Sequence, residues 1–253
     1  MATKQKTLLI LGATSAVAHA YTRSVAANKT HDHFILVARS ADKLKSVEED
    51  IAARSGVKVT AIAAEIGDPS AVSNIMTDIL EKADTIHEYL LAYGVLGEQG
   101  DLQQDIPQLQ SLLDTNFVSA ALWMESLATQ FEKQSHGHAI IIGSVAGDRG
   151  RQSNYLYGAT KAGLERISEG MAHRFAGQKD IHVTLVKPGF IDTPMTAHIE
   201  KSGPLWATPE QVAQSMKGAV AKKRVRIYTP WFWRFILLIV RAVPIPIFHK
   251  TKM

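Results

Sequence analysis

Short apolar segments of strand length alternate along this chain with longer segments in which apolar residues recur at helical spacing. Strands that alternate with helices of ten or more residues favour right-handed crossovers and a parallel sheet covered on both faces. The pattern therefore predicts an α/β fold with a doubly wound parallel sheet of about seven strands. The expected strands are residues 7–11, 34–38, 57–63, 89–92, 139–142, 183–186 and 225–228.

The composition is that of a globular chain, with 46% hydrophobic and 21% charged residues among 253. A chain of this length buries a sizeable core. We expect one compact domain over residues 1–228, followed by an apolar and basic extension over residues 229–253. The absence of cysteine excludes disulfides and cysteine-ligated metals, and we assign no metal site. The first residues lack the long apolar stretch of a secretory signal, so we expect a cytoplasmic protein.

Ligands of doubly wound sheets bind beyond the carboxyl ends of the strands, so the residues that follow each strand are the first candidates for function. After the first strand, Gly12 permits a tight turn, and Ser15 lies near the start of a predicted helix. A helix N-terminus favours a bound phosphate. With one glycine in the segment, an ordinary strand-to-helix turn is the alternative interpretation.

The end of the second strand bears on the type of nucleotide. An acidic residue at this point accepts hydrogen bonds from a ribose 2′-hydroxyl, whereas an arginine pairs with a 2′-phosphate. Here Arg39 follows the strand, and no acidic residue is present. We therefore expect NADP(H) as the preferred cofactor, with NAD(H) possible. The alternative is that Arg39 caps the sheet edge and the site accepts either cofactor.

A serine, a tyrosine and a lysine follow the fifth predicted strand in an arrangement that suits carbonyl chemistry. Ser144 lies just past the strand, and Tyr157 and Lys161 are four residues apart, on one face of a predicted helix. Hydride transfer to a ketone requires a proton for the developing alkoxide, and Tyr157 is the candidate donor. An ammonium group at Lys161 would favour the Tyr157 phenolate. Ser144 would hold the substrate oxygen in place.

Together these segments resemble the short-chain dehydrogenase/reductase family over nearly the whole chain. The resemblance implies a Rossmann-type fold, and it implies that Asn116 in LLDTNFVSA completes a catalytic set with Ser144, Tyr157 and Lys161. It further implies that the Pro-Gly segment after the sixth strand contacts the nicotinamide end of the cofactor. The residues expected to contact the dinucleotide are Gly12, Thr14, Ser15, Ala16, Val17, Arg39, Glu65, Ile66, Ala92, Gly94, Tyr157, Lys161, Pro188, Gly189, Ile191 and Thr193.

Two segments depart from the family pattern. The glycine-rich loop has alanine at positions 16 and 18, and the Asn-Asn-Ala-Gly segment reads Leu-Ala-Tyr-Gly over residues 91–94. The alanines would narrow the phosphate loop. A regulator that binds NADP(H) without turnover is therefore a second interpretation, and the retained catalytic set counts against it.

The C-terminal segment WFWRFILLIVRAV, residues 231–243, is apolar except for Arg234 and Arg241. It is too short for a transmembrane helix, which takes about 20 residues. It favours a helix lying in the plane of a membrane surface; the alternative is a helix packed over the substrate pocket or against another subunit. Residues 211–253 hold nine basic and no acidic residues, which favours anionic headgroups. The residues assigned to headgroups are Arg224, Arg226, Lys250 and Lys252.

Either position of this helix implies a large, apolar substrate. Arg149 and Arg151 lie between Ser144 and Tyr157, and they would pair with an anionic group such as a phosphodiester unless they are solvated loop residues. AYGVLG, SVAGDRGRQSNYLYGATKAGL and the C-terminal segment resemble the decaprenylphosphoryl-2-keto-ribose reductase branch of the family. This resemblance implies a keto-sugar on a polyprenyl phosphate. A 3-ketoacyl or other long-chain ketone is the alternative substrate.

These patterns exclude one class of macromolecular partner and predict two. We expect no nucleic acid, because apolar residues interrupt the basic tail. The family resemblance implies a homo-oligomer, a dimer or tetramer, formed through the helices that bear Asn116 and Tyr157. Peripheral association with the inner face of a membrane is the third expectation, and it depends on the C-terminal segment.

Overall fold

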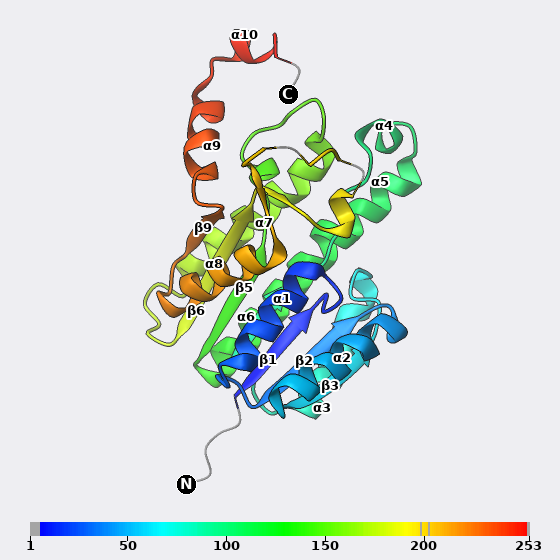
Figure 1. Ribbon diagram of the computed structural model, residues 1–253, viewed down its shortest axis with the longest axis vertical. Coiled ribbons are helices and arrows are strands. Elements are labelled where there is room, and N and C mark those ends of the chain that lie inside the picture. Colours follow the sequence, from blue (N-terminus) through cyan, green and yellow to red (C-terminus); the bar gives the residue numbers. More distant parts are fainter. Residues whose placement is uncertain (1–5, 198, 202, 252–253) are drawn as a thin grey trace.

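The computed structural model describes residues 6–197, 199–201 and 203–251. Its centre is a seven-stranded parallel sheet with strand order β3-β2-β1-β4-β5-β6-β9 (Figure 1). The order reverses between β1 and β4, which is where doubly wound sheets bind their ligands. The predicted fold class is confirmed. The strands are β1 (Thr7–Leu11), β2 (His33–Ala38), β3 (Lys58–Ala63), β4 (Glu88–Leu91), β5 (Gly137–Ile142), β6 (Ile181–Pro188) and β9 (Arg226–Thr229).

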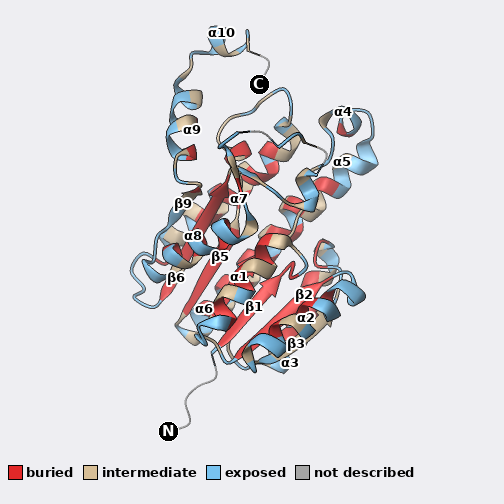
Figure 2. Ribbon diagram, in the orientation of Figure 1, coloured by how far each residue is buried: buried red, intermediate tan, exposed pale blue. Residues whose placement is uncertain are grey.

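Three helices cover each face of the sheet, and each layer encloses its own apolar core (Figure 2). The central strands are buried throughout, as expected for strands covered on both faces. The helices on one face are α1 (Ala16–Ala27), α2 (Ala41–Ser55) and α8 (Pro209–Ala221). Those on the other face are α3 (Val72–Lys82), which follows the short 3₁₀ turn η1 (Pro69–Ala71), α6 (Ser119–Gln134) and α7 (Tyr155–Arg174).

Helix boundaries follow local capping chemistry. Ser40 accepts a hydrogen bond from the Lys43 amide at the start of α2, and Gly56 ends that helix with a φ of 64°. Thr208 and Gln211 form a reciprocal capping box at the start of α8. The caps at Ser40 and Thr208 fix where α2 and α8 begin.

The helix that leads into α6 contains a π-helical turn. The short helix α4 (Gln99–Leu102) precedes α5 (Ile106–Leu113), which continues through the π turn η2 (Asp114–Val118) into α6. Such turns widen the helix and occur frequently at functional sites. This one contains Asn116.

Two features after β6 were not expected from the sequence. A second, two-stranded sheet pairs β7 (Phe190–Ile191) with β8 (Trp206–Ala207), and the 3₁₀ turn η4 (Pro194–Thr196) lies between them. Pairs this short carry little pattern, because alternation needs several residues. A further 3₁₀ turn, η3 (Val145–Gly147), follows β5.

The C-terminal extension forms α9 (Trp233–Ala242) and a single helical turn, α10 (Ile245–Phe248), on either side of Pro244. Both project beyond the carboxyl end of the sheet (Figure 1). Within the described ranges, every helix is too short or too polar to pass through a bilayer. The predicted headgroup contact Lys252 lies outside the described residues.

Candidate active site

A cavity of about 820 Å³ opens at the carboxyl edge of the sheet, beside the reversal of strand order. Segments that are far apart in the sequence meet in its wall, because the parallel strands all end at this edge. The sequence-predicted residues that line it are Gly12, Thr14, Ser15, Ala16, Val17, Arg39, Glu65, Ile66, Ala92, Gly94, Ser144, Arg151, Tyr157, Lys161, Pro188, Gly189, Ile191 and Thr193. Asn116 lies one layer behind the wall.

One end of the cavity suits a phosphate. Gly12 has a φ of +92°, and an added Cβ would lie 2.8 Å from Cβ of Tyr93, so only glycine fits this turn. Ser15 begins α1 without a side-chain hydrogen bond to the first-turn amides, and no acidic residue occupies that turn. The helix N-terminus therefore presents its positive end to the cavity. The two alanines of the loop leave this arrangement intact.

Arg39 lies just past β2 on the rim of this end. Its Nε is 3.8 Å from a carboxylate oxygen of Glu65, and both side chains are more than half exposed. Exposed ion pairs of this kind contribute little, about 0–1 kcal/mol. The guanidinium is therefore available to a phosphate placed at the rim.

The three residues proposed for carbonyl chemistry converge on the opposite end of the cavity. Tyr157 and Lys161 come from the first turns of α7, and Ser144 comes from the loop after β5. The Ser144 hydroxyl accepts a hydrogen bond from the Ala146 amide at 3.0 Å, which caps η3. Lys161 Nζ donates to the Ile142 carbonyl at 3.2 Å and lies 5.8 Å from the centre of the Tyr157 ring.

Burial controls the ionisation of this group. It raises the pKa of Tyr157 to about 12, an effect that the hydrogen bond from Ser144 partly opposes. Burial also lowers the pKa of Lys161 to about 8. Near neutral pH the phenol therefore keeps its proton while the amine remains charged. The pKa of Tyr157 is therefore not lowered as the sequence analysis expected, because desolvation of the buried phenol is the largest effect on it.

Asn116 supports this end of the cavity through the backbone. Its side-chain amide accepts from the Val95 amide at 2.8 Å and donates to the Val95 carbonyl at 2.7 Å. Gly94 passes between the catalytic groups: an added Cβ would lie 3.0 Å from Asn116 Oδ1 and 3.7 Å from Lys161 Nζ. The π turn thus places the asparagine beside Gly94, close to the lysine.

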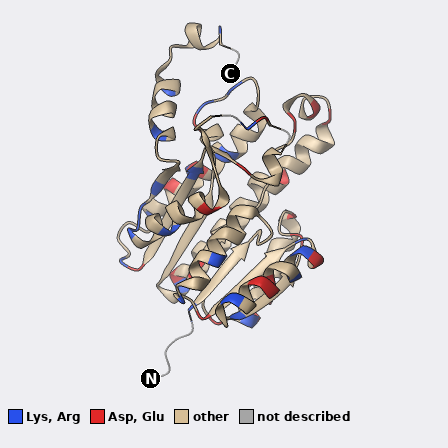
Figure 3. Ribbon diagram, in the orientation of Figure 1, with Lys and Arg blue, Asp and Glu red and all other residues tan. Residues whose placement is uncertain are grey.

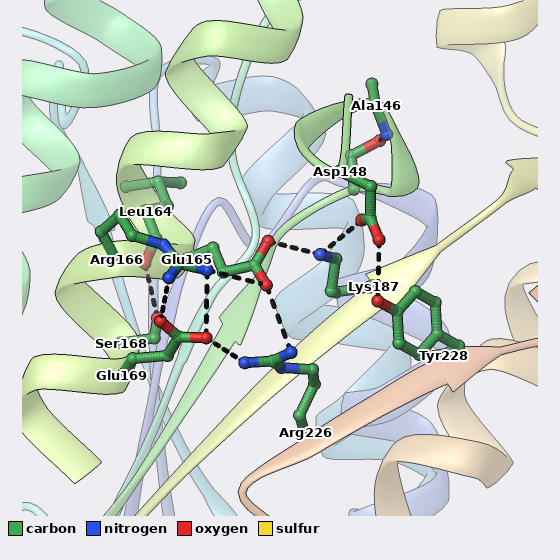
Figure 4. Close-up of polar contacts among 11 residues, drawn as sticks. Ala146, Asp148, Leu164, Glu165, Arg166, Ser168, Glu169, Lys187, Arg226 and Tyr228 are labelled. Atoms are coloured by element: carbon green, nitrogen blue, oxygen red, sulfur yellow. Dashed lines mark hydrogen bonds and ion pairs between the residues drawn. The ribbon is translucent and has the colours of Figure 1, made fainter. Parts of the chain in front are cut away.

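A buried charge cluster behind the site was not found by the sequence analysis (Figure 4). Lys187, the residue before the Pro-Gly segment, has Nζ 2.5 Å from a carboxylate oxygen of Asp148 and also pairs with Glu165. Tyr228 donates to Asp148 at 2.8 Å, and Arg226 lies 3.5 Å from Glu165. The cluster therefore connects α7, the η3 loop, β6 and β9. Its member Glu165 lies one helical turn beyond Lys161 on α7.

This cluster corrects one tail assignment. Arg226 does not face lipid headgroups, because it pairs with Glu165 and Glu169 of α7. It belongs to β9, whose neighbour in the sheet is β6, and not to the projecting tail. Arg224 does not adjoin the tail either, because it lies before the amino end of β9, at the opposite edge of the sheet. No local sequence signal distinguishes it from the other basic residues near the C-terminus.

The tail forms part of the cavity wall. Trp233 lines the cavity, and its Nε1 donates to the Leu205 carbonyl at 3.3 Å. An added Cβ at Gly189 would lie 1.9 Å from Trp233 Nε1, so the glycine makes room for the indole. One face of the C-terminal helix therefore packs over the pocket, which is one of the two placements expected from the sequence.

Arg149 does not lie where the sequence analysis placed it. Its Nη1 donates to the carbonyls of Val240, Arg241 at 3.3 Å and Val243 at 2.7 Å, and its guanidinium carbon lies 3.7 Å from the centre of the Phe248 ring. The free carbonyls at the end of α9 attract the cation more directly than the cavity does. Arg149 thus anchors the tail instead of binding substrate.

Comparison with known proteins associates this geometry with oxidoreductases. The family model described as short chain dehydrogenase matches residues 6–203. An uncharacterized oxidoreductase of Mycobacterium tuberculosis is 27% identical over 237 residues, which cover 94% of this chain and 93% of the relative. An uncharacterized oxidoreductase of Streptomyces coelicolor is 26% identical over 245 residues, 97% of this chain and 95% of the relative.

Solved structures share the fold. A short-chain dehydrogenase from Sphingobium yanoikuyae in complex with NADPH has a TM-score of 0.82 at 23% identity, with 95% of this chain and 97% of that chain covered. A structure from a study of 7β-hydroxysteroid dehydrogenase stereoselectivity has a TM-score of 0.81 at 21% identity, with 94% and 92% covered. At these levels of sequence identity, the similarity shows a shared fold.

Proposed function

Since the chain belongs to the short-chain dehydrogenase family and is an oxidoreductase, we propose that it reduces the carbonyl group of an amphiphilic substrate to an alcohol, with NADPH as the preferred reductant. The convergence of Tyr157, Lys161 and Ser144 on one end of a cavity carries this proposal. Arg39 rims the opposite end of that cavity. Bound NADPH would supply the hydride.

The residues have distinct tasks in this reaction. The Tyr157 hydroxyl donates its proton to the substrate oxygen, which gains negative charge as the carbonyl carbon is reduced. The Ser144 hydroxyl hydrogen-bonds the same oxygen and fixes its position. The charged amine of Lys161 favours the phenolate that remains on Tyr157. The raised pKa of Tyr157, about 12, keeps the donor protonated before the reaction.

The walls of the cavity support an amphiphilic substrate. Apolar side chains of Leu96, Phe190, Met195 and Trp233 line it. Such a surface favours an acyl or prenyl chain. A keto-sugar carried on a polyprenyl phosphate is the first substrate to test, and a 3-ketoacyl or long-chain ketone is the second.

We propose Arg151 as the residue that distinguishes these substrates. It lines the cavity, and burial lowers its pKa, an effect that Asp148 opposes. With Arg149 held by the tail, Arg151 remains as the candidate partner of an anionic substrate group. Arg151→Ala should raise the KM of the phosphate-linked ketone and leave that of an uncharged long-chain ketone within about twofold.

The cofactor preference is tested by fluorescence titration with NADPH and NADH. We expect Arg39→Ala to weaken NADPH binding at least about tenfold, because it removes a charge-assisted hydrogen bond, and to leave NADH binding nearly unchanged. Arg54→Ala, at the opposite end of α2, is the matched control with a similarly exposed guanidinium. Saturable binding of both nucleotides with no effect of Arg39→Ala would remove the NADP(H) preference. Absence of binding would remove the reductase proposal.

Turnover is tested separately with Tyr157→Phe. The variant keeps the ring that lines the cavity but lacks the proton donor, so reduction should fall at least about a hundredfold while NADPH still binds. NADPH oxidation in the presence of each candidate ketone is the measurement. A fully active Tyr157→Phe enzyme would reject the assigned mechanism. A wild-type protein that binds NADPH but reduces none of these ketones would favour a nucleotide-binding regulator.

A further inference from the structure

The inner face of α9 is packed against the catalytic domain. Trp233 and Leu237 are buried against Val145 of the η3 loop, and Ile236 and Val240 pack at the border of this contact. The same face reaches the cavity through Trp233. One side of the helix therefore already has its apolar partner within the chain.

Arg149 fixes the orientation of the helix. Its three hydrogen bonds cap the last carbonyls of α9, and the ring of Phe248 covers the guanidinium. A helix held at both its inner face and its C-terminus presents a defined outer face.

The outer face of α9 is apolar and exposed. Phe235, Leu238 and Ile239 lie on it, and further exposed apolar residues precede and follow the helix. Figure 2 shows α9 and α10 as largely exposed. A surface helix whose inner face is buried normally carries polar residues on the other side. A contiguous exposed apolar patch indicates an interaction surface. We call this patch the tail face; its members are Trp231, Phe235, Leu238, Ile239, Ile245 and Ile247.

The charged residues of the C-terminal segment are all basic. Arg234 and Arg241 lie on α9, Lys250 follows it, and the last acidic residue of the chain is Glu210. In Figure 3 the ribbon of α9 carries basic but no acidic positions. A two-fold contact between copies brings a patch against itself, so these arginines would meet cations instead of carboxylates. A surface of anionic headgroups complements them.

From this arrangement we propose that the tail face docks onto an anionic lipid bilayer and turns the mouth of the cavity toward the headgroups. The aromatic rings and aliphatic side chains enter the boundary between headgroups and acyl chains, and the arginines remain at headgroup level. Docking in itself does not depend on the proposed reaction. Where it deepens that proposal, it lets an amphiphilic substrate reach the cavity from the bilayer, and this part rests on the proposed function.

The test is co-sedimentation of the protein, free of nucleotide and substrate, with vesicles of phosphatidylcholine alone or mixed with phosphatidylglycerol. We expect binding to the mixed vesicles, weakened by salt because part of the attraction is electrostatic. Ile239→Glu should lower the partition coefficient at least about tenfold, since a charge replaces an inserted side chain. The matched control is Ile106→Glu on α5, because both isoleucines are 68% exposed.

A double arginine variant, thermal unfolding and light scattering complete the test. Arg234→Gln with Arg241→Gln should abolish the preference for phosphatidylglycerol, and thermal unfolding verifies that each variant folds. Wild-type protein that binds neither vesicle, or equal losses in Ile239→Glu and Ile106→Glu, would overturn the proposal. The proposal would also be overturned if the wild type bound no vesicles and light scattering gave a lower molecular mass for Ile239→Glu than for the wild type. A second copy of the chain would then cover the tail face. Since no turnover is measured, failure here leaves the reductase proposal untouched.

Discussion

Replacing Lys187 with methionine would test how strongly the buried charge cluster holds the site together (Figure 4). Lys187 is 1% exposed and pairs with both Asp148 and Glu165. Methionine keeps most of the apolar stem and removes the ammonium. Asp148 would then depend on the hydroxyl of Tyr228, whereas Glu165 would keep Arg226 at 3.5 Å.

The expected cost is large because a buried carboxylate loses its cation. Breaking a buried ion pair by removing one partner costs about 3–5 kcal/mol. In a chain of this size, that corresponds to a fall in Tm of roughly 6–20 °C. The assay is urea unfolding followed by circular dichroism, with the free energy of unfolding obtained by linear extrapolation. Lys201→Met is the control: Lys201 pairs with Asp192 at an exposed site, so its loss should cost less than about 1 kcal/mol.

A second substitution separates charge from packing. In Lys187→Met with Asp148→Asn, the cluster no longer contains the carboxylate that lost its cation, so at least about half of the lost stability should return. The reasoning is refuted if Lys187→Met costs no more than Lys201→Met. It is equally refuted if the double variant is as unstable as the single one, because packing alone would then explain the loss.

Three other perturbations test the site from different sides. Burial lowers the pKa of Lys161 from 10.5 to about 8, so the folded protein binds this proton less readily than the unfolded chain, and wild-type stability should rise between these pH values. Lys161→Met should lack this rise, be inactive and be more stable near pH 7 by on the order of 1–3 kcal/mol, which urea unfolding against pH would measure. Gly94→Ala puts a methyl group 3.0 Å from Asn116 Oδ1 at a φ of +153°, and kcat should fall at least about tenfold while NADPH binding changes less. In Gly189→Ala the new Cβ would lie 1.9 Å from Trp233 Nε1, so the indole would have to move. Proteolysis of the C-terminal extension should then accelerate, and the KM for long-chain ketones should rise.

The fold was predictable from the sequence because each central strand is short, apolar and followed by a helix. The predicted β1 agrees with the structure at both ends, and the other six strands differ by at most a few residues at an end. The last strand, expected at residues 225–228, runs from Arg226 to Thr229. Pattern alone could not set that boundary, because parallel pairing with β6 determines which residues join the sheet.

Side-chain partners were less predictable, because they depend on elements that meet only in the folded chain. Arg149 and Arg151 are two residues apart and were expected to act together, yet one caps α9 and the other lines the cavity. Lys187 gave no local signal either. Its partners are 39 and 22 residues away in sequence, at Asp148 and Glu165. Spacing predicts contacts along one helix, as for Tyr157 and Lys161, but not contacts across layers.

Gly189 shows how one residue serves two neighbouring parts of the site. The family resemblance explains it as part of a segment beside the nicotinamide, and its missing side chain also admits Trp233 of the C-terminal extension. Lys187 anchors the same segment from the other side through Asp148, the residue immediately before the tail anchor Arg149. The η3 loop, the Pro-Gly segment and α9 therefore form one packed unit. It follows that a substitution at Gly189 affects the wall contributed by the tail together with the proposed cofactor contact, so its effects on cofactor and on substrate should appear together.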